Sequence, residues 1–232
     1  MKIGIIGAIS QETEILKKII HPYAERMVRN YKIYIKTFKK NDIFLIKSGV
    51  GKVSASIATM ILINFFKIDI IINSGSAGSL NSQLKIGDII IPQKTCYYDV
   101  DLTNFGYFQG QIPKYPKKFT INKKIYNFFE KKSYKHELKF TKGLIISGDS
   151  FIRENSRMKF LKKIFPSAIA VEMESAAIAQ VCYKFNIPLI VIKSISDASD
   201  NNATLNFKKN VSFASCQLVK FVKIILENLI NI

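Results

Sequence analysis

The chain has 232 residues, of which 48% are hydrophobic, so it can bury the core of one α/β domain but is short for two. Its three cysteines form no CxxC pair, which argues against disulfides and zinc, and no apolar run reaches the roughly 20 residues of a membrane helix. The net charge of +18 rests on scattered lysines with few arginines, which predicts a solvated basic surface rather than a specific nucleic-acid site. We therefore expect one domain over residues 1–232, in the reducing cytoplasm, with no membrane partner, metal or cofactor.

Apolar runs separated by polar breaks predict strands and helices that alternate along the chain. The first half is predicted to contain strand Ile3–Ala8, helix Ser10–Ile20, strands Tyr31–Phe38 and Ile43–Ser48 in a hairpin, helix Val53–Phe66, and strand Ile68–Asn73 followed by a turn at Ser74–Ser79. The second half is predicted to contain strand Asp88–Pro92, a long aromatic loop Asp99–Lys118, helix 121–132, strand 142–147, helix 155–164, strand 168–173, helix 174–185, strand 188–194 and helix Phe207–Asn228. This alternation predicts a three-layer α/β/α sandwich.

Two carboxylates stand one residue apart where a predicted strand gives way to a helix. Glu172 and Glu174 follow the apolar run that ends at Val171 and precede a run of small helix-forming residues. Open α/β sheets bind their ligands at the carboxyl ends of strands, so the pair suits a substrate with hydroxyls or developing positive charge. The structural alternative is that both acids only complement the positive end of the helix dipole.

Polar side chains also follow the other predicted strands. Glu12 comes just after the first strand, Ser76 lies in the predicted glycine-rich turn, and the segments Ser147–Ile152 and Ser194–Asp197 follow later strands. Acids and hydroxyls at five strand ends predict one ligand site at one edge of the sheet. Nucleotide motifs and metal sites are not indicated: no G-x-G-x-x-G or P-loop spacing is present, and His21 and His136 are isolated.

Seven short motifs follow one another along the chain: Lys2–Ala8, Lys47–Val53, Ile72–Gly78, Phe105–Tyr107, Ser147–Asp149, Val171–Glu174 and Ser194–Asp197. In this order they resemble the 5′-methylthioadenosine/S-adenosylhomocysteine nucleosidases of the nucleoside phosphorylase/hydrolase superfamily. The likeness runs from end to end. It implies a mixed central sheet and hydrolysis of the N-glycosidic bond of these adenine nucleosides and of 5′-deoxyadenosine, in methionine salvage and the recycling of S-adenosylmethionine by-products.

The resemblance implies a role for each polar residue, and the chemistry agrees with it. Cleavage of the bond between adenine and ribose builds positive charge on the sugar and negative charge on the base, so an acid and a base suffice, as in inverting glycoside hydrolysis. Asp197 would serve adenine N7 and N6, and Glu12 would activate water, the co-substrate, with support from Ser76. Glu174 would hold the ribose hydroxyls.

The resemblance also places apolar residues around the substrate. Met173 would pack on the sugar, Phe151 would stack on adenine, and the backbone of Ile152 would read the edge of the base. The pocket for the 5′-alkylthio group would combine residues of both subunits of a homodimer: Val50 and Phe207 from one, and Leu102, Phe105 and Pro113 from the other. Gly78 and Ser196 complete the predicted binding residues.

Several positions depart from the family pattern. Ile9 stands where methionine is common near the ribose, and Lys193 stands where an arginine near the water is frequent. Ser10 and Gln11 replace acids that often precede Glu12. Arg153 is an unusual basic side chain beside the predicted adenine site. We expect these changes to affect rate and substrate preference more than the reaction itself.

Two alternative functions remain. A phosphorolytic purine or uridine phosphorylase of the same superfamily would carry a phosphate-binding arginine at the entry to the glycine-rich turn. Asn73 holds that place here, which favours water as the nucleophile. A basic nucleic-acid-binding domain would use the lysine surface, but it would leave the acids at the strand ends unexplained.

Overall fold

The apolar runs of the sequence form the centre of one mixed β-sheet in the computed structural model, which describes residues 1–134 and 139–228. The strands in these ranges are β1 (Lys2–Gly7), β2 (Ala24–Val28), β3 (Tyr31–Phe38), β4 (Asn41–Lys47), β5 (Ile70–Ser79), β6 (Ile89–Ile90), β7 (Lys94–Tyr97), β8 (Phe119–Thr120), β9 (Leu144–Ser147), β10 (Ala168–Glu172) and β11 (Leu189–Asp197). The central strands β1, β5, β9 and β11 are buried at all or all but one of their residues, as expected for a sheet that is covered on both faces.

The sheet follows the order β2-β3-β4-β1-β5-β10-β9-β7-β8, and β11 pairs with both β5 and β6. Strand β1 is parallel to β4 and β5, and β11 is also parallel to β5. Strand β10, by contrast, runs antiparallel to β5. The predicted mixed sheet is therefore confirmed.

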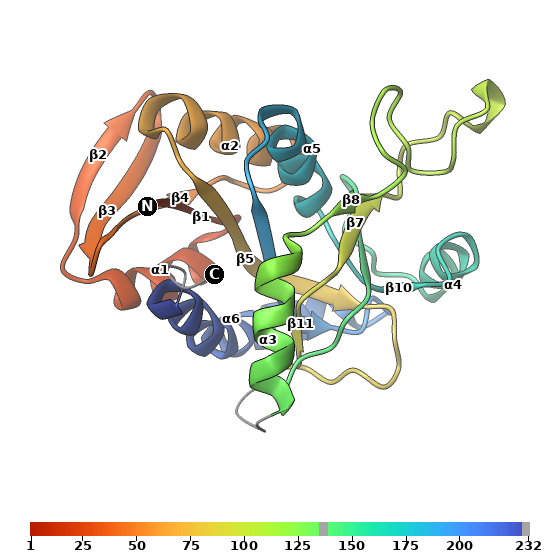
Figure 1. Cartoon of the computed structure of the whole chain (residues 1–232). Coiled ribbons are helices and arrows are strands. Elements are labelled where there is room, and N and C mark those ends of the chain that lie inside the picture. The colour runs from red at the N-terminus through yellow and green to blue at the C-terminus, as the bar shows by residue number, and fades with distance from the viewer. Residues whose placement is uncertain (135–138, 229–232) are drawn as a thin grey trace.

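Helices cover both faces of this sheet (Figure 1). They are α1 (Ser10–Ile20), α2 (Lys52–Phe66), α3 (Lys123–Tyr134), α4 (Asn155–Ile164), α5 (Ser175–Phe185) and α6 (Ala203–Asn228), with a short 3₁₀ helix at Thr103–Phe105. Helices α2 and α5 pack together on one face, and α1 and α6 pack together on the other. The predicted three-layer α/β/α sandwich is thus confirmed. No helix in the described ranges combines the length and the hydropathy that crossing a membrane requires.

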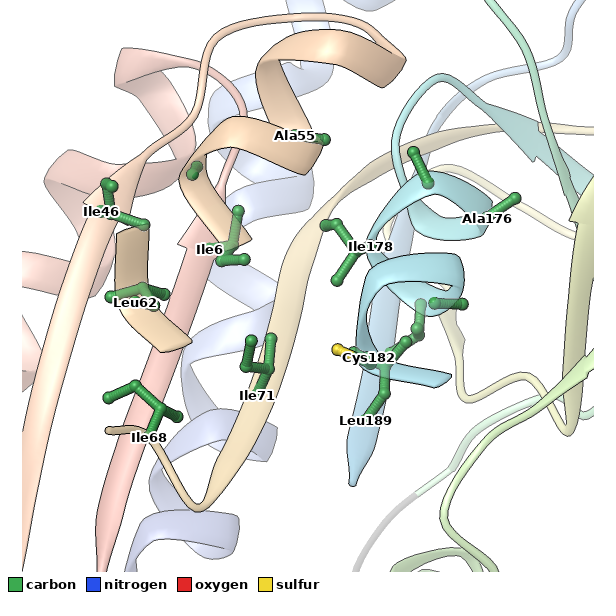
Figure 2. Packing of buried hydrophobic residues seen from close by; sticks show 14 of the residues in the cluster. Ile6, Ile46, Ala55, Leu62, Ile68, Ile71, Ala176, Ile178, Cys182 and Leu189 are labelled. Carbon is green, nitrogen blue, oxygen red and sulfur yellow. The ribbon is translucent and has the colours of Figure 1, made fainter. Parts of the chain in front are cut away.

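Alternation along the strands divides the core between the two faces. Ile6 and Ile71 point toward α2 and α5, where they meet Leu62 and Ile178 (Figure 2). Successive side chains of a strand point to opposite faces, so Ile5 and Ile72 belong to the separate cluster under α1 and α6. Since burying one such side chain stabilises the fold by about 1.5–3 kcal/mol, these two layers fix the position of the strand ends.

The largest difference from the sequence-based elements lies in β5. The turn predicted at Ser74–Ser79 is wrong, because β5 continues to Ser79 and its residues from Ile71 to Gly78 pair with β11. Strand β11 likewise runs beyond the predicted end at residue 194 to Asp197. Serine and glycine predict turns when they are read locally, but here a neighbouring strand holds their backbone and their small size leaves room for other side chains.

Smaller differences concern edge elements. Strands β2, β7 and β8 were not predicted, and the strand expected at Asp88–Pro92 is only the two residues of β6. Helix α6 begins at Ala203, four residues before the predicted Phe207. The segment Asp99–Lys118 is largely without regular structure, as predicted, apart from the 3₁₀ helix that it contains.

Candidate active site

The candidate site lies where β5 changes its neighbours. The first half of β5 pairs with β1 as far as Asn73, which lies opposite Ile6, and its end pairs with β10 from Gly78. Between these two points, no strand in the described chain pairs with β5 on that side. A change of neighbour in an open α/β sheet leaves a crevice at the carboxyl ends of the strands, and ligands bind there.

A cavity of about 360 Å³ occupies this crevice. Ten residues proposed from the sequence line it: Glu12, Val50, Ser76, Gly78, Phe151, Met173, Glu174, Ser196, Asp197 and Phe207. A second cavity of about 30 Å³ shares several of these walls and adds Ile152. Two other hollows, of about 420 and 550 Å³, lie beside β8 and α3, but neither has a carboxylate or a histidine in its described wall. The chemistry therefore points to the crevice beside β5.

The carboxylate of Glu12 binds β5 where no strand pairs with it on that side. Its Oε1 accepts hydrogen bonds from the backbone N–H of Ser76 at 2.8 Å and from the Ser76 hydroxyl at 2.9 Å. Its Oε2 accepts from the backbone N–H groups of Ala8 at 2.8 Å and Ile9 at 3.3 Å. A Cβ atom at Gly75 would lie 2.8 Å from Oε1, so any larger residue at this strand position would displace the carboxylate. The carboxylate is thus fixed in one orientation at the cavity wall.

Glu172, which lines the cavity, forms a buried ion pair with Lys193. The Nζ atom of Lys193 lies 3.0 Å from Oε2 of Glu172, and both side chains are almost fully buried. Burial opposes both charges, but the mutual attraction and the hydrogen bonds to Glu172 outweigh it. The pKa of Glu172 is therefore lowered, and that of Lys193 is raised by Glu172 and the other carboxylates nearby.

Glu172 also closes the first turn of α5. It accepts the backbone N–H groups of Glu174 at 3.1 Å and of Ser175 at 2.9 Å, together with the hydroxyl of Ser147. Glu172 thus lines the cavity next to Glu174, but its oxygens are engaged by Lys193 and the first turn of α5, as the helix-terminus alternative predicts. The sequence could not show this, because Lys193 approaches from a strand that does not pair with β10.

Glu174 has a different environment although it is only two residues away. It is the N-cap residue of α5, and its Oε1 accepts the backbone N–H of Gly51 at 2.9 Å. Burial and the negative charge of Glu172 raise its pKa to about 8, against the opposing effect of Lys193. Glu174 can therefore carry a proton near neutral pH while it faces the cavity.

Asp197 ends β11 at the opposite wall. Its Oδ1 accepts the backbone N–H of Ser199 at 2.9 Å, and its Oδ2 accepts the hydroxyl of Ser196 at 2.8 Å. A Cβ atom at Gly78 would lie 2.8 Å from Oδ1, so the carboxyl group rests against the bare backbone of β5. Burial raises the pKa of Asp197, although the two hydrogen bonds work in the opposite direction. The group is suited to give a proton to a leaving group.

Aromatic side chains form the outer part of the cavity. The rings of Phe151 and Phe207 meet edge to face, with their centroids 5.6 Å apart. Leu102, Phe105 and Pro113 do not line the cavity of their own chain. They belong to the segment 99–118, which projects from the body of the protein (yellow-green, Figure 1), and Phe105 is 77% exposed.

An ionic network that was not predicted ties three surrounding segments together. Lys52 at the start of α2 lies 2.7 Å from Asp99 and 3.6 Å from Asp149, and Asp149 also accepts the backbone N–H of Lys52 at 2.8 Å. No group of three or more His, Cys, Asp or Glu in the described ranges has the arrangement of a metal site. His21 is exposed beside Tyr23, and His136 lies outside the described residues.

Comparisons with known proteins agree with this geometry. A family model described as the phosphorylase superfamily matches residues 2–227. A 5′-methylthioadenosine/S-adenosylhomocysteine nucleosidase of Buchnera aphidicola subsp. Acyrthosiphon pisum (strain Tuc7) is 75% identical over 231 residues and is covered completely, as is this chain.

Solved structures show the same likeness. An S-adenosylhomocysteine nucleosidase from Streptococcus pyogenes, in complex with 5-methylthiotubericidin, matches with a TM-score of 0.94 and 35% identity, over 99% of this chain and 97% of that one. A 5′-methylthioadenosine/S-adenosylhomocysteine nucleosidase from Neisseria meningitidis, in complex with methylthio-immucillin-A, matches with a TM-score of 0.93 and 34% identity, over 98% and 99%.

We expect Glu174 to make the folded protein less stable as the pH rises. The carboxyl group of glutamate ordinarily titrates near 4.5, whereas in the folded site the pKa of Glu174 is about 8. Its contribution to stability is therefore complete below about pH 4.5 and is lost as the pH rises through about 8. Each pKa unit corresponds to about 1.4 kcal/mol. In urea unfolding, the unfolding free energy of Glu174→Gln should therefore rise relative to that of the wild type by a few kcal/mol between about pH 5 and pH 8.

The exposed Glu154 before α4, whose side chain makes no cap hydrogen bond, provides the control. Glu154→Gln should change the pH dependence of the unfolding free energy far less than Glu174→Gln over the same interval. If the stability difference between Glu174→Gln and the wild type did not vary with pH, the protonated state of Glu174 would be refuted.

Proposed function

The chain belongs to the phosphorylase superfamily and, within it, to the 5′-methylthioadenosine/S-adenosylhomocysteine nucleosidases, and we propose that it hydrolyses the N-glycosidic bond of these two nucleosides to adenine and the 5-substituted ribose. The observation that carries this proposal is the gathering of Glu12, Glu174 and Asp197 at one cavity. We include 5′-deoxyadenosine among the substrates, because it shares the base and the sugar. The reaction would serve methionine salvage and the recycling of S-adenosylmethionine by-products.

The charges around the cavity favour water over phosphate as the nucleophile. No lysine or arginine is among the described residues that line it. Lys193, behind the wall, is bound to Glu172. Asn73, at the place where a phosphorylase would carry its arginine, is buried between the Ile6 carbonyl at 3.5 Å and the Ser175 hydroxyl at 2.8 Å. A phosphate dianion would therefore meet carboxylates without a cation.

Asp197 is the general acid in this proposal. The bond to adenine breaks more easily when the departing base gains a proton, and a carboxyl group with a raised pKa keeps its proton to a higher pH than an ordinary aspartate does. The hydrogen bonds from Ser196 and Ser199 keep both oxygens in place. They also stabilise the carboxylate that remains after the proton has moved to N7.

Glu12 is the general base on the other side of the sugar. Its carboxylate is held by backbone N–H groups and by the Ser76 hydroxyl, so that a water molecule bound beside Ser76 meets an oriented proton acceptor. Glu174, with Met173 beside it in the cavity wall, binds the ribose hydroxyls. The proton on Glu174 allows it to donate to one hydroxyl while its other oxygen accepts from the next.

The apolar surface beside the site supports the proposal of a homodimer. Val53 and Ile57 on α2 are 71% and 45% exposed, and Phe105 and Phe108 on segment 99–118 are 77% and 54% exposed. Exposed apolar side chains of this density mark interaction surfaces. In the dimer, Leu102, Phe105 and Pro113 of one subunit would complete the 5′-alkylthio pocket around Val50 and Phe207 of the other.

The cysteines support a reducing location, for which we propose the cytoplasm. All three are free, and burial raises the pKa of Cys96 and Cys182 to about 12. These thiols therefore stay protonated and unreactive. Because the charges of the cavity disfavour phosphate groups, we also propose no specific nucleic-acid partner for this site.

Product analysis is the direct test of the reaction. Incubation with 5′-methylthioadenosine should release adenine and free methylthioribose, at a rate that added phosphate does not change. Chromatography of the products with and without phosphate makes the measurement. A requirement for phosphate, or methylthioribose 1-phosphate as the product, would place the chain with the phosphorylases.

Removing the acid or the base should slow the chemical step. Asp197→Asn and Glu12→Gln should each lower kcat by about 10²–10⁴-fold, the usual contribution of a positioned acid or base. Glu14→Gln is the matched control, because Glu14 lies on the same helix as Glu12 but is exposed. Near-normal turnover by Asp197→Asn would show that another group protonates the base.

Removing the projecting ring should affect substrates according to their 5′-substituent. Phe105→Ala should raise KM for 5′-methylthioadenosine more than for adenosine, which lacks the alkylthio group, and the wild type should sediment as a dimer. Phe160→Ala on α4 is the control, since that ring is also half exposed but lies outside the cavity wall. A fully active monomer would refute the shared pocket.

A further inference from the structure

One buried hydroxyl beside the cavity has no role in the proposed reaction. Ser199 lies two residues after the end of β11 and is 1% exposed. Its backbone N–H binds Asp197, but its Oγ is among the buried side-chain atoms of the described chain without a hydrogen-bond partner. Leaving a buried hydroxyl unpaired is unfavourable, so the position requires a reason.

The backbone at Ser199 is also unusual. Its φ angle is +52°, in the left-handed region that residues other than glycine seldom adopt. Other turns of this chain adopt the same region, and at Ser199 the hydrogen bond to Asp197 Oδ1 helps to hold it. The strained turn therefore keeps the hydroxyl of residue 199 next to the carboxyl group of residue 197.

Gly78 shows where the hydroxyl lies. A Cβ atom at Gly78 would lie 2.2 Å from Ser199 Oγ and 2.8 Å from Asp197 Oδ1. The two oxygen atoms thus meet the same bare patch of β5. Ser199 and Asp197 also line the small inner cavity of about 30 Å³, together with Phe151 and Ile152. Phe151, Ile152 and Asp197 are the residues to which the family resemblance assigns the adenine base, so Ser199 borders the place expected for adenine.

We propose that Ser199 is a specificity-determining residue, and that its Oγ accepts a hydrogen bond from the 6-amino group of the bound adenine. This inference rests on the proposed function. On the edge of adenine that faces Asp197, the polar atoms are N7 and the 6-amino nitrogen. Each oxygen of Asp197 already accepts one bond from the protein, and the carboxyl group serves N7. The neighbouring hydroxyl shares the amino N–H on this edge and so gains the partner that it lacks.

The test removes each partner of this bond in turn. Hydrolysis of 5′-methylthioadenosine is compared with that of its analogue in which hydrogen replaces the 6-amino group. Ser199→Ala keeps the Cβ atom, and hence the backbone strain, but lacks the hydroxyl. It should lower kcat/KM for 5′-methylthioadenosine by about 3–10-fold, the effect of one neutral hydrogen bond, and leave the value for the analogue unchanged.

Ser215→Ala is the matched control. Ser215 on α6 is 3% exposed and its hydroxyl is also unpaired, but it lies outside the cavity walls. This variant should change neither substrate. If Ser199→Ala does not fold, Ser199→Gly removes the same hydroxyl and suits the positive φ angle.

An equal loss for both substrates would overturn the proposal, because the hydroxyl would then act through Asp197 or through the fold. No loss for either substrate would overturn it as well. Calorimetric binding of free adenine and of unsubstituted purine to the same proteins makes this comparison without turnover. Absence of hydrolysis would therefore count against the proposed function, whereas equal effects of Ser199→Ala on the two bases would count against the hydrogen bond.

Discussion

The buried ion pair between Glu172 and Lys193 is the constraint on which the rest of the site depends. Glu172 ends β10, whereas Lys193 lies in the middle of β11, opposite Gly75 of β5. Strands β10 and β11 do not pair with each other, so the two side chains meet across the segment of β5 with the smallest side chains. Removing one partner of a buried pair typically costs about 3–5 kcal/mol, since the other charge stays buried alone. The pair therefore adds a side-chain link between β10 and β11 to the backbone pairing that each of them makes with β5.

This pair gives different properties to carboxyl groups that lie close together. Lys193 lowers the pKa of Glu172 and keeps it ionised. The burial of Glu174 and the negative charge of Glu172 raise the pKa of Glu174 to about 8. The carboxyl group of Asp197 accepts hydrogen bonds from Ser196 and Ser199 rather than from a lysine. Burial raises its pKa. Neighbouring acids whose environments separate their pKa values are typical of sites that need an acid and a base at one pH. Glu174 and Asp197 can thus hold a proton at a pH at which Glu172 is ionised.

The sequence predicted the layers of the fold and most residues of the cavity wall, because both depend on local pattern. Apolar runs showed the strands, and polar residues at their ends pointed to Glu12, Glu174 and Asp197. The pairing of Glu172 with Lys193 and the course of β5 could not be predicted, because they depend on which distant strands become neighbours. Ser199 was missed for a similar reason: only the packing against Gly78 shows that its hydroxyl is buried.

The same small residues of β5 also explain the choice of nucleophile. The absence of a side chain at Gly75 leaves room for the carboxylate of Glu12 beside the strand. Asn73, two residues earlier, accepts a hydrogen bond from the Ser175 hydroxyl. Two unit charges of the same sign 4 Å apart repel by about 4 kcal/mol at an effective dielectric constant near 20. A doubly charged phosphate beside Glu12 would thus bind at least roughly 10³-fold more weakly than it would without that charge. Water is neutral and escapes this penalty, and in the proposed reaction it gains Glu12 as an oriented proton acceptor. The strand that separates the acids thereby also selects hydrolysis over phosphorolysis.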